Sequence, residues 1–385
     1  MTRSVPLGEL ISITRGITYK SALLGRPGPV LLGLASIARN GGFRVDSLRT
    51  YGGESPARLL VRPGELFASL KDVTQAADLL GSVARVPADG PLGRLTQDTV
   101  RIDVTSEAVD PAYLYLALLT PQYRAFCRSH ATGTTNLGLP RDDFMAYEIP
   151  LPSLAEQHRI ASVLDALDAL IETERRNAKK AEELWHALVL SATGDGDKTC
   201  LSALASFVNG KNFTKAASGT GRAVIRTPEV RRGPGTSTVW NSVDAADENL
   251  ASVGDMLFVW SGSLLVGRWL WGPALINQHI FKVMPSPDVP PWLAYWAIEE
   301  LMEDFLGVAA DKATTMGHIK RGDLDRLVAC PARDRWADLD ALIRPLWDES
   351  LQARVQAEAL TRTRDELLPL LMSGRVRVHD MGQAA

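Results

Sequence analysis

Apolar residues recur at alternating spacings of four and three residues through the middle of the chain. The positions are Ile160, Leu164, Leu167, Ile171, Glu174, Ala178, Ala181, Trp185 and Leu188. Such a heptad repeat is typical of a long helix that packs against another helix, and charged residues occupy its other faces. Prolines at 150 and 152 hold the residues before them extended, and Ser153 with Glu156 has the spacing of a capping box. We therefore predict a long helix over residues 153–192, although an ordinary amphipathic surface helix also explains this repeat when it is taken alone.

The same repeat returns 182 positions later, near the C-terminus. Its members are Leu342, Leu346, Glu349, Ala353, Gln356, Leu360, Thr363, Leu367 and Leu370. Two matched repeats in one chain favour the pairing of the two helices with each other. In an antiparallel pair the midpoints Glu174 and Gln356 would meet at the centre, where a lone polar contact can fix the register. We predict a second long helix and a C-terminal segment over residues 336–378, followed by a tail over 379–385.

The segments outside these helices read as two similar mixed α/β domains, over residues 1–152 and 193–335, the latter with a short linker at 193–199. In the first domain, strands are expected at 30–35, 65–70 and 100–104, and a capped helix begins at Pro111. Four segments of the first domain have counterparts in the second, in the same order. The pairs are 10–16 with 204–210, 64–67 with 254–258, 95–100 with 276–281, and 134–144 with 314–324.

This collinear order indicates a tandem duplication, although short motifs can also match by chance. The predicted fold class is α+β, with two similar mixed α/β domains separated by two long antiparallel coiled-coil helices. The repeat of domain and helix implies an internal pseudo-two-fold symmetry.

The composition is that of a globular protein. The 385 residues can form two or three domains, with 45% hydrophobic and 23% charged residues. No apolar run of about 18 residues and no signal-peptide core occurs, so we expect no membrane association and a cytoplasmic location. The three cysteines, Cys127, Cys200 and Cys330, are scattered, which favours a reduced protein without a structural zinc site.

The net charge of −3 does not by itself indicate nucleic-acid binding. Residues 1–152 carry 16 basic against 14 acidic residues, and residues 200–335 carry 14 of each, so the helical segments hold the negative balance. Any contact with DNA must therefore use a local basic face on one of the two domains.

Motifs of the common catalytic sites are missing from the sequence. It contains no Gly-x-x-x-x-Gly-Lys-Ser/Thr loop, no Asn-Pro-Pro-Tyr, no His-Glu-x-x-His and no Gly-x-Ser-x-Gly. The paired carboxylates Asp142 and Asp143 follow Pro140, where a turn or capping role is the simpler interpretation. No catalytic or metal-binding residues are predicted.

Several segments resemble the specificity subunit of type I restriction–modification systems. Residues 149–160, Ile-Pro-Leu-Pro-Ser-Leu-Ala-Glu-Gln-His-Arg-Ile, resemble the start of that family's central conserved helix, and residues 367–378 are similar to its closing segment. Gly262-Ser263 and residues 277–283 resemble the body of its target recognition domains. The resemblance covers essentially the whole chain in the family's order. The chain differs at residues 329–332, where Ala-Cys-Pro-Ala replaces Ile-Pro-Leu-Pro and no Ala-Glu-Gln follows.

The resemblance implies a non-catalytic subunit that reads a split sequence in double-stranded DNA, one half per target recognition domain. It also implies two methyltransferase subunits docked on the helices and translocase–nuclease subunits in the full complex. S-adenosylmethionine, ATP and magnesium would then be bound by those partners, and no cofactor is expected in this chain. Because a duplicated chain supplies both readers, one copy per complex is expected.

The length of the helices suits a spacer between two readers. The repeat from Ile160 to Leu188 spans 28 residue steps, or roughly 42 Å at about 1.5 Å per residue. Half-sites one turn of B-DNA apart are about 34–36 Å between centres. Helix length would therefore set the gap between the half-sites.

Candidate DNA contacts are basic and amide side chains, with some hydroxyls, near matched glycine turns, since such groups bind phosphates and base edges. In the first domain they are Arg15, Tyr19, Lys20, Arg39, Asn40, Arg44, Lys71, Thr134, Thr135 and Asn136. In the second they are Lys211, Asn212, Lys215, Arg226, Arg231, Arg232, Arg268, Lys312, Thr314, Thr315 and Lys320. Any one of them could instead be a solvated surface residue.

Two other functions stay open at this point. One is a coiled-coil scaffold with two protein-binding domains and no DNA-reading role. The other is an enzyme, a methyltransferase or nuclease, whose motifs have degenerated.

Overall fold

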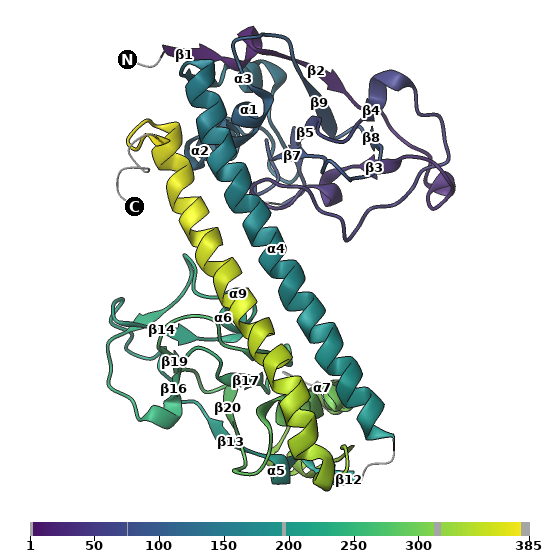
Figure 1. Cartoon of the computed structure of the whole chain (residues 1–385). Coiled ribbons are helices and arrows are strands. Elements are labelled where there is room, and N and C mark those ends of the chain that lie inside the picture. The colour runs from purple at the N-terminus through teal and green to yellow at the C-terminus, as the bar shows by residue number, and fades with distance from the viewer. Residues whose placement is uncertain (1–2, 75, 195–197, 312–316, 379–385) are drawn as a thin grey trace. The chain divides into compact units, whose positions relative to one another are not determined.

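The structure is a computed structural model that describes residues 3–74, 76–194, 198–311 and 317–378. The chain forms two compact units, residues 1–168 with 362–385, and residues 169–361. Both predicted long helices are present, α4 (Leu154–Thr193) and α9 (Trp336–Met372), and each contributes residues to both units (Figure 1). Within the described residues, none of the helices combines the length and apolarity needed to cross a membrane.

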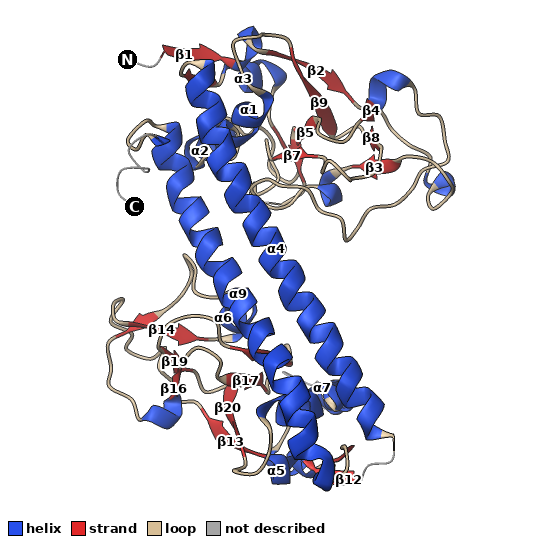
Figure 2. Cartoon of the chain, in the orientation of Figure 1, coloured by secondary structure: helices blue, strands red, loops and turns tan. Residues whose placement is uncertain are grey.

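The first unit contains a mixed α/β domain built on two sheets, drawn in red in Figure 2. The antiparallel sheet has the order β2 (Ile11–Arg15), β9 (Thr99–Val104), β5 (Leu66–Ser69), β7 (Val83–Arg85). The second sheet has the order β3 (Val30–Leu32), β8 (Gly93–Leu95), β4 (Leu60–Val61), with β3 parallel to β8. Two further antiparallel pairs are β1 (Arg3–Pro6) with β11 (Glu148–Leu151), and β6 (Lys71–Asp72) with β10 (Leu137–Gly138). The helices are α1 (Pro111–Ala117), α2 (Pro121–Ser129) and α3 (Arg141–Ala146).

The second unit repeats this plan. Its antiparallel sheet has the order β13 (Ala205–Asn209), β20 (Ile280–Pro285), β17 (Met256–Val259), β18 (Leu265–Arg268). Its second sheet has the order β15 (Trp240–Asn241), β14 (Arg222–Ile225), β19 (Ala274–Ile276), β16 (Leu250–Ala251), with β14 parallel to β19. The pair β12 (Lys198–Cys200) with β21 (Leu327–Ala329) corresponds to β1 with β11. The helices are α5 (Leu201–Leu204), α6 (Thr227–Arg232), α7 (Pro291–Glu300) and α8 (Met302–Asp311).

The strand registers confirm the predicted duplication. Arg15 lies opposite Val100 at the end of β2, and Asn209 lies opposite Phe281 at the end of β13. The next residue is a glycine in both units, and a Cβ atom there would lie about 2 Å from a backbone oxygen of the neighbouring turn, 2.0 Å for Gly16 and 2.2 Å for Gly210. Only glycine fits such an approach, so the same backbone geometry is imposed twice.

The long helices pack antiparallel within each unit. In the first unit Ile160 and Leu164, near the start of α4, share a core with Leu368 and Leu371, near the end of α9. In the second unit the end of α4, with Trp185 and Val189, shares a core with the start of α9, including Leu339 and Ile343. The predicted positions on α4 are buried or half-buried throughout.

The pairing face of α9 differs from the prediction at alternate positions. Its buried and half-buried heptad positions are Leu339, Ile343, Leu346, Ser350, Ala353, Ala357, Leu360, Arg364, Leu367 and Leu371. Leu342 is 61% exposed and Gln356 is also exposed, so their predicted places in the buried face are wrong. Leu370 is half-buried, beside the buried Leu371.

The cause is that α9 packs on two neighbours. In the second unit Leu339, Ile343 and Trp347 lie in the cluster that also contains residues of α4 and the buried residues of α7. A helix that packs against a domain as well as a partner helix buries a face wider than a two-position stripe. Because Leu342 and Ile343 are both apolar, the spacing alone does not choose between them.

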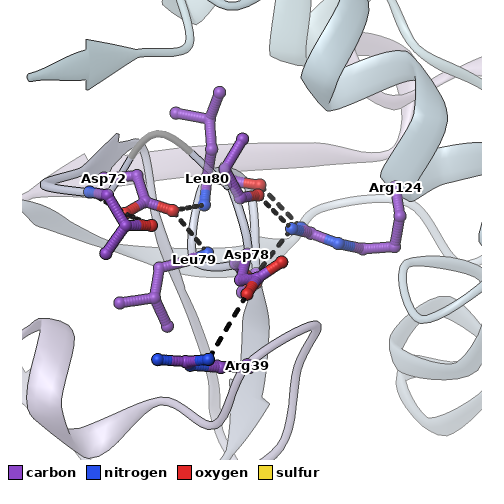
Figure 3. Close-up of polar contacts among 9 residues, drawn as sticks. Arg39, Asp72, Asp78, Leu79, Leu80 and Arg124 are labelled. Atoms are coloured by element: carbon purple, nitrogen blue, oxygen red, sulfur yellow. Dashed lines mark hydrogen bonds and ion pairs between the residues drawn. The ribbon is translucent and has the colours of Figure 1, made fainter. Parts of the chain in front are cut away.

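The connection between β5 and β7 is held by two buried charged side chains (Figure 3). The carboxylate of Asp72 accepts hydrogen bonds from the backbone N–H groups of Leu79 at 2.6 Å and Leu80 at 3.2 Å. From α2, the guanidinium of Arg124 donates to the backbone oxygens of Ala77, Asp78 and Leu80 at 3.0, 3.0 and 2.6 Å. The connection is therefore a shaped element of the domain, although it has little regular secondary structure.

A neighbouring glycine turn is tied to this connection. The backbone N–H of Asn40, which has a positive φ of 65°, donates to the backbone oxygen of Asp78 at 2.8 Å. Arg39 forms an ion pair of 3.8 Å with the Asp78 carboxylate, and Gly42 donates to Val83. We call these contacts of Asp72, Arg124, Arg39 and Asn40 with the β5–β7 connection the brace. In the second unit only residues 260–264 separate β17 from β18, so the second unit has no equivalent connection to hold.

Substitutions at the adjacent residues Leu342 and Ile343 test which face of α9 is buried. We expect Ile343→Ala to lower the free energy of unfolding by about 2–5 kcal/mol, because Ile343 is fully buried. Leu342→Ala is the matched control and should change it by less than about 0.5 kcal/mol. Chemical denaturation measures both, and equal losses would contradict the face described above.

The brace on the β5–β7 connection gives a second test. Arg124→Met leaves three backbone oxygens without their donor, at a cost of about 1–3 kcal/mol, and should speed hydrogen exchange across residues 77–82. Arg128→Met, at an exposed position on the same helix, is the control and should leave exchange unchanged. Unaltered exchange in Arg124→Met would show that the connection keeps its shape without the guanidinium.

Candidate nucleic-acid interface

A cleft opens at the same place in both units, where the first strand of the antiparallel sheet ends. In the first unit its volume is about 570 Å³, and it is lined by Ile13, Arg15, Leu70, Lys71, Gln97, Asp98, Val100, Thr132, Gly138, Leu139, Pro140 and Arg141. In the second unit it is about 370 Å³, lined by Asn209, Trp260, Phe281, His318, Ile319, Lys320 and Arg321.

The lining residues correspond by position in the two sheets. Arg15 and Asn209 end their strands, and Leu70 and Trp260 directly follow β5 and β17. Residues 138–141 match 318–321 at the offset of 180 seen in the sequence. The chain therefore presents the same cleft twice, with different side chains at the matched positions.

The first cleft gathers three exposed cations, Arg15, Lys71 and Arg141. The Arg15 Nε donates a long hydrogen bond of 3.4 Å to the backbone oxygen of Gln97. Within the described residues, the Lys71 ammonium, the Arg141 guanidinium and the Asp98 carboxylate have no hydrogen-bond or ion-pair partner in the chain. These groups therefore remain available to a ligand that presents phosphates and polar edges.

The second cleft has an aromatic wall. The ring of Trp260 stacks on Phe281 with centroids 5.6 Å apart and planes inclined by 28°. Its Nε1–H donates to the Asn209 Oδ1 at 2.9 Å, which fixes the indole and uses the amide oxygen. Lys320 and Arg321 supply exposed positive charge at the rim. Trp260, which directly follows the apolar strand β17, is half-buried and lines the cleft.

Other predicted DNA contacts of the first domain lie on exposed loops. Tyr19 meets the Tyr51 ring edge-on at 6.2 Å, and the Lys20 backbone N–H donates to the Tyr51 hydroxyl at 3.2 Å. Arg44 forms an exposed ion pair of 3.4 Å with Asp46. The exposed residues Thr134, Thr135 and Asn136 lie between Thr132 and Leu137, at the rim of the cleft, while Arg39 and Asn40 lie on the braced turn described above.

Most predicted contacts of the second domain are also exposed. Lys211, Asn212 and Lys215 follow Gly210, and the Asn212 side chain shapes the turn by accepting from the Thr214 hydroxyl at 2.8 Å. Arg231 and Arg232 are exposed at the end of α6. Lys312, Thr314 and Thr315 lie outside the described residues.

Arg268 is a correction because it is buried, and Arg226 forms a structural ion pair although its side chain is partly exposed. Arg226 donates to the buried Glu229 at 2.7 and 3.1 Å at the start of α6, and this hydrogen bonding raises its pKa. Arg268 is 6% exposed, with its guanidinium 3.9 Å from the centre of the Trp347 ring. Burial lowers the pKa of Arg268 to about 10. A sequence does not reveal such burial, since the partners come from distant segments.

Sequence reasoning missed three residues of the first cleft, Gln97, Asp98 and Arg141. A signal was present, because Thr96-Gln97-Asp98 matches Asn277-Gln278-His279 between the two domains. A matched turn at the end of matched strands marks a repeated surface, and it could have been included for that reason.

Residues 95–183 match the family model of the type I restriction modification DNA specificity domain. A comparison with curated protein sequences gives no match.

Three solved structures match this chain. The type I restriction–modification S subunit from M. genitalium is 15% identical with a TM-score of 0.63, over 97% of this chain and 96% of that chain. The HsdS subunit from Thermoanaerobacter tengcongensis is 18% identical over 97% of each chain, with a TM-score of 0.35. A chain from a study of complex assembly and conformational transition of the type I R-M system is 19% identical, over 96% of this chain and 97% of that chain, with a TM-score of 0.39.

The M. genitalium S subunit, with a TM-score of 0.63, shares the fold of this chain. That likeness extends over nearly the whole chain, and the sequence match lies across the end of the first domain and most of α4. Residues 95–183 are thus similar in sequence to the type I restriction modification DNA specificity domain, and nearly the whole chain shares the fold of the M. genitalium S subunit.

Proposed function

We propose that this chain is the DNA sequence-recognition subunit of a type I restriction–modification complex, and that each domain reads one half of a split target. The observation that carries the proposal is the repeated cleft, which has one backbone frame and two different sets of side chains. A shared frame suits one class of ligand, and different side chains suit different sequences within that class. Sequence is read by side chains at base edges, while cations position the protein on phosphates.

The helix pair would dock two methyltransferase subunits and set the distance between half-sites. Leucines remain on the outer faces of α4, where Leu170 is 50% and Leu184 is 56% exposed. Exposed apolar residues along a charged helix offer anchor points for a protein partner. S-adenosylmethionine, ATP and magnesium would belong to the methyltransferase and translocase–nuclease subunits, with one copy of this chain per complex.

The chain itself would contribute recognition without catalysis. Specificity subunits of the type that residues 95–183 resemble are in general non-catalytic. The alternative is a coiled-coil scaffold whose two domains bind proteins. Unengaged cations beside Gln97 and Asp98 in one cleft favour the reading of DNA over that alternative.

Binding should depend on the partners. Both domains are close to neutral, so we expect the isolated chain to bind a duplex carrying its target weakly. Addition of the methyltransferase subunits should restore tight binding. The logarithm of the binding constant should then fall linearly with the logarithm of the salt concentration. Fluorescence anisotropy from about 50 to 200 mM salt measures this. Tight, specific binding by the chain alone would contradict the role given to the partners, and no binding with them would favour the scaffold.

The spacer can be tested by lengthening both helices in register. A repeat of residues 171–177 in α4 together with a repeat of residues 351–357 in α9 adds one heptad to each. At about 1.5 Å per residue this is about 10.5 Å, or about three base pairs of unread DNA at about 3.4 Å each. Sequencing of the methylated sites measures the spacer.

An insertion in α4 alone is the control, since it breaks the helix register and should lower stability and methylation together. An unchanged spacer in the doubly extended chain would contradict the idea that helix length sets the gap.

A further inference from the structure

We infer that the cleft of the first domain reads a G·C base pair, with Arg15 donating to the guanine and Asp98 accepting from the cytosine. The inference rests on the proposed function and goes further, because it assigns a base pair to named side chains. It also predicts that the two half-sites of the target differ.

The backbone places the two groups in one cleft. Arg15 ends β2, and Asp98 lies in the turn between β8 and β9, the strand paired with β2. The hydrogen bond from Arg15 Nε to the backbone oxygen of Gln97, 3.4 Å long, sets the guanidinium beside that turn. The turn is itself fixed, since the Leu70 N–H donates to the backbone oxygen of Asp98 at 3.3 Å.

The groups of Arg15 and Asp98 that could bind a base edge make no hydrogen bond or ion pair within the described part of the chain. Across the described part of the chain, the Asp98 carboxylate has no donor and forms no ion pair with Arg15, and the outer nitrogens of the Arg15 guanidinium have no acceptor. By contrast, Arg39, Arg44 and Arg226 each face a carboxylate of the same unit. A carboxylate in the cleft would repel a phosphate, so the cleft suits base edges, and Lys71 and Arg141 suit the backbone around it.

The chemistry favours one base pair. Guanine presents two acceptors, O6 and N7, which fit the forked donors of an arginine, and cytosine presents the N4 amino donor, which fits a carboxylate. In an A·T pair neither base offers two adjacent acceptors in the major groove. A guanidinium beside a carboxylate therefore matches G·C best.

In the described part of the second unit, the positions of Arg15 and Asp98 carry other side chains. Asn209 stands at the position of Arg15, and its amide oxygen is occupied by the Trp260 Nε1–H at 2.9 Å. His279 stands at the position of Asp98, next to Gln278 in the matched motif. The pair of side chains proposed for the first half-site is therefore not repeated at the matched described positions of the second domain.

The experiment uses the full-length chain assembled with the methyltransferase subunits of the same system and a library of duplexes randomised in both half-sites. Sequencing of the methylated duplexes gives the target. A cleavage reagent tethered at Thr134→Cys, on the exposed rim of the first cleft, identifies the half-site that the first domain contacts. We expect an invariant G·C pair in that half-site.

Two variants then test the named residues. Arg15→Gln should shift the preference at that position from guanine toward adenine, because glutamine pairs with adenine N6 and N7. Asp98→Ala should relax the same base pair by about tenfold or more. In both variants the other half-site should stay unchanged, which serves as an internal control for folding and assembly. Arg141→Gln is the matched control at the rim and should weaken binding to all sequences equally, with a salt slope reduced by about one.

The outcomes separate this inference from the proposed function. A wild-type complex that methylates without sequence preference would overturn both. A selective complex whose first half-site tolerates any base pair would overturn the inference alone. So would Arg15→Gln and Asp98→Ala variants that lose methylation equally at every sequence.

Discussion

The structure depends on the burial of one apolar face of α4 and one of α9 in the same core as a domain. In the first unit Leu114 of α1 shares a cluster with Leu164 of α4 and Leu371 of α9. In the second, Trp292 of α7 shares a cluster with Trp185 and Trp347 of the long helices. Apolar burial of this kind is the dominant favourable term in folding. Each domain and its stretch of the two long helices therefore share one hydrophobic core.

A second link between sheet and helix is repeated with different chemistry. Arg85 and Arg268 hold equivalent places, opposite Leu66 and Met256 in the two antiparallel sheets. Arg85 forms an ion pair of 2.8 Å with Asp165 of α4, whereas Arg268 is buried over the Trp347 ring and donates to its backbone oxygen at 2.7 Å. A guanidinium tolerates such burial because it is weakly hydrated and stacks on aromatic faces. Both units thus carry an arginine at this place in the sheet, but the residue of the long helix that it contacts differs.

Sequence periodicity was enough to predict the two helices, the repeat and the glycine turns, because these follow from local spacing and from matched segments. It was not enough for the face of α9, since Leu342 and Ile343 are adjacent apolar residues and only contact with the domain selects the second. Charge was a poor guide for the same reason. Arg15, Lys71 and Lys320 line the clefts, but Arg268 has the same charge and lies in the interior. The difference lies in long-range packing, which no local pattern contains.

Substitutions in the buried core and the glycine turns, here called the frame, cost more stability than substitutions in the clefts. Changes in the frame are costly: a Cβ at Gly16 or Gly210 would collide with backbone, and a truncated core side chain such as Ile343 costs about 2–5 kcal/mol. Substitution of an exposed side chain without partners changes the free energy of unfolding by less than about 0.5 kcal/mol. Arg15, whose side chain makes one long hydrogen bond, is close to that case. Trp260 donates a hydrogen bond to Asn209, so the side chains of the second cleft are less free to change than those of the first. The first cleft is therefore the one in which a new base preference could arise by single substitution, with little loss of stability.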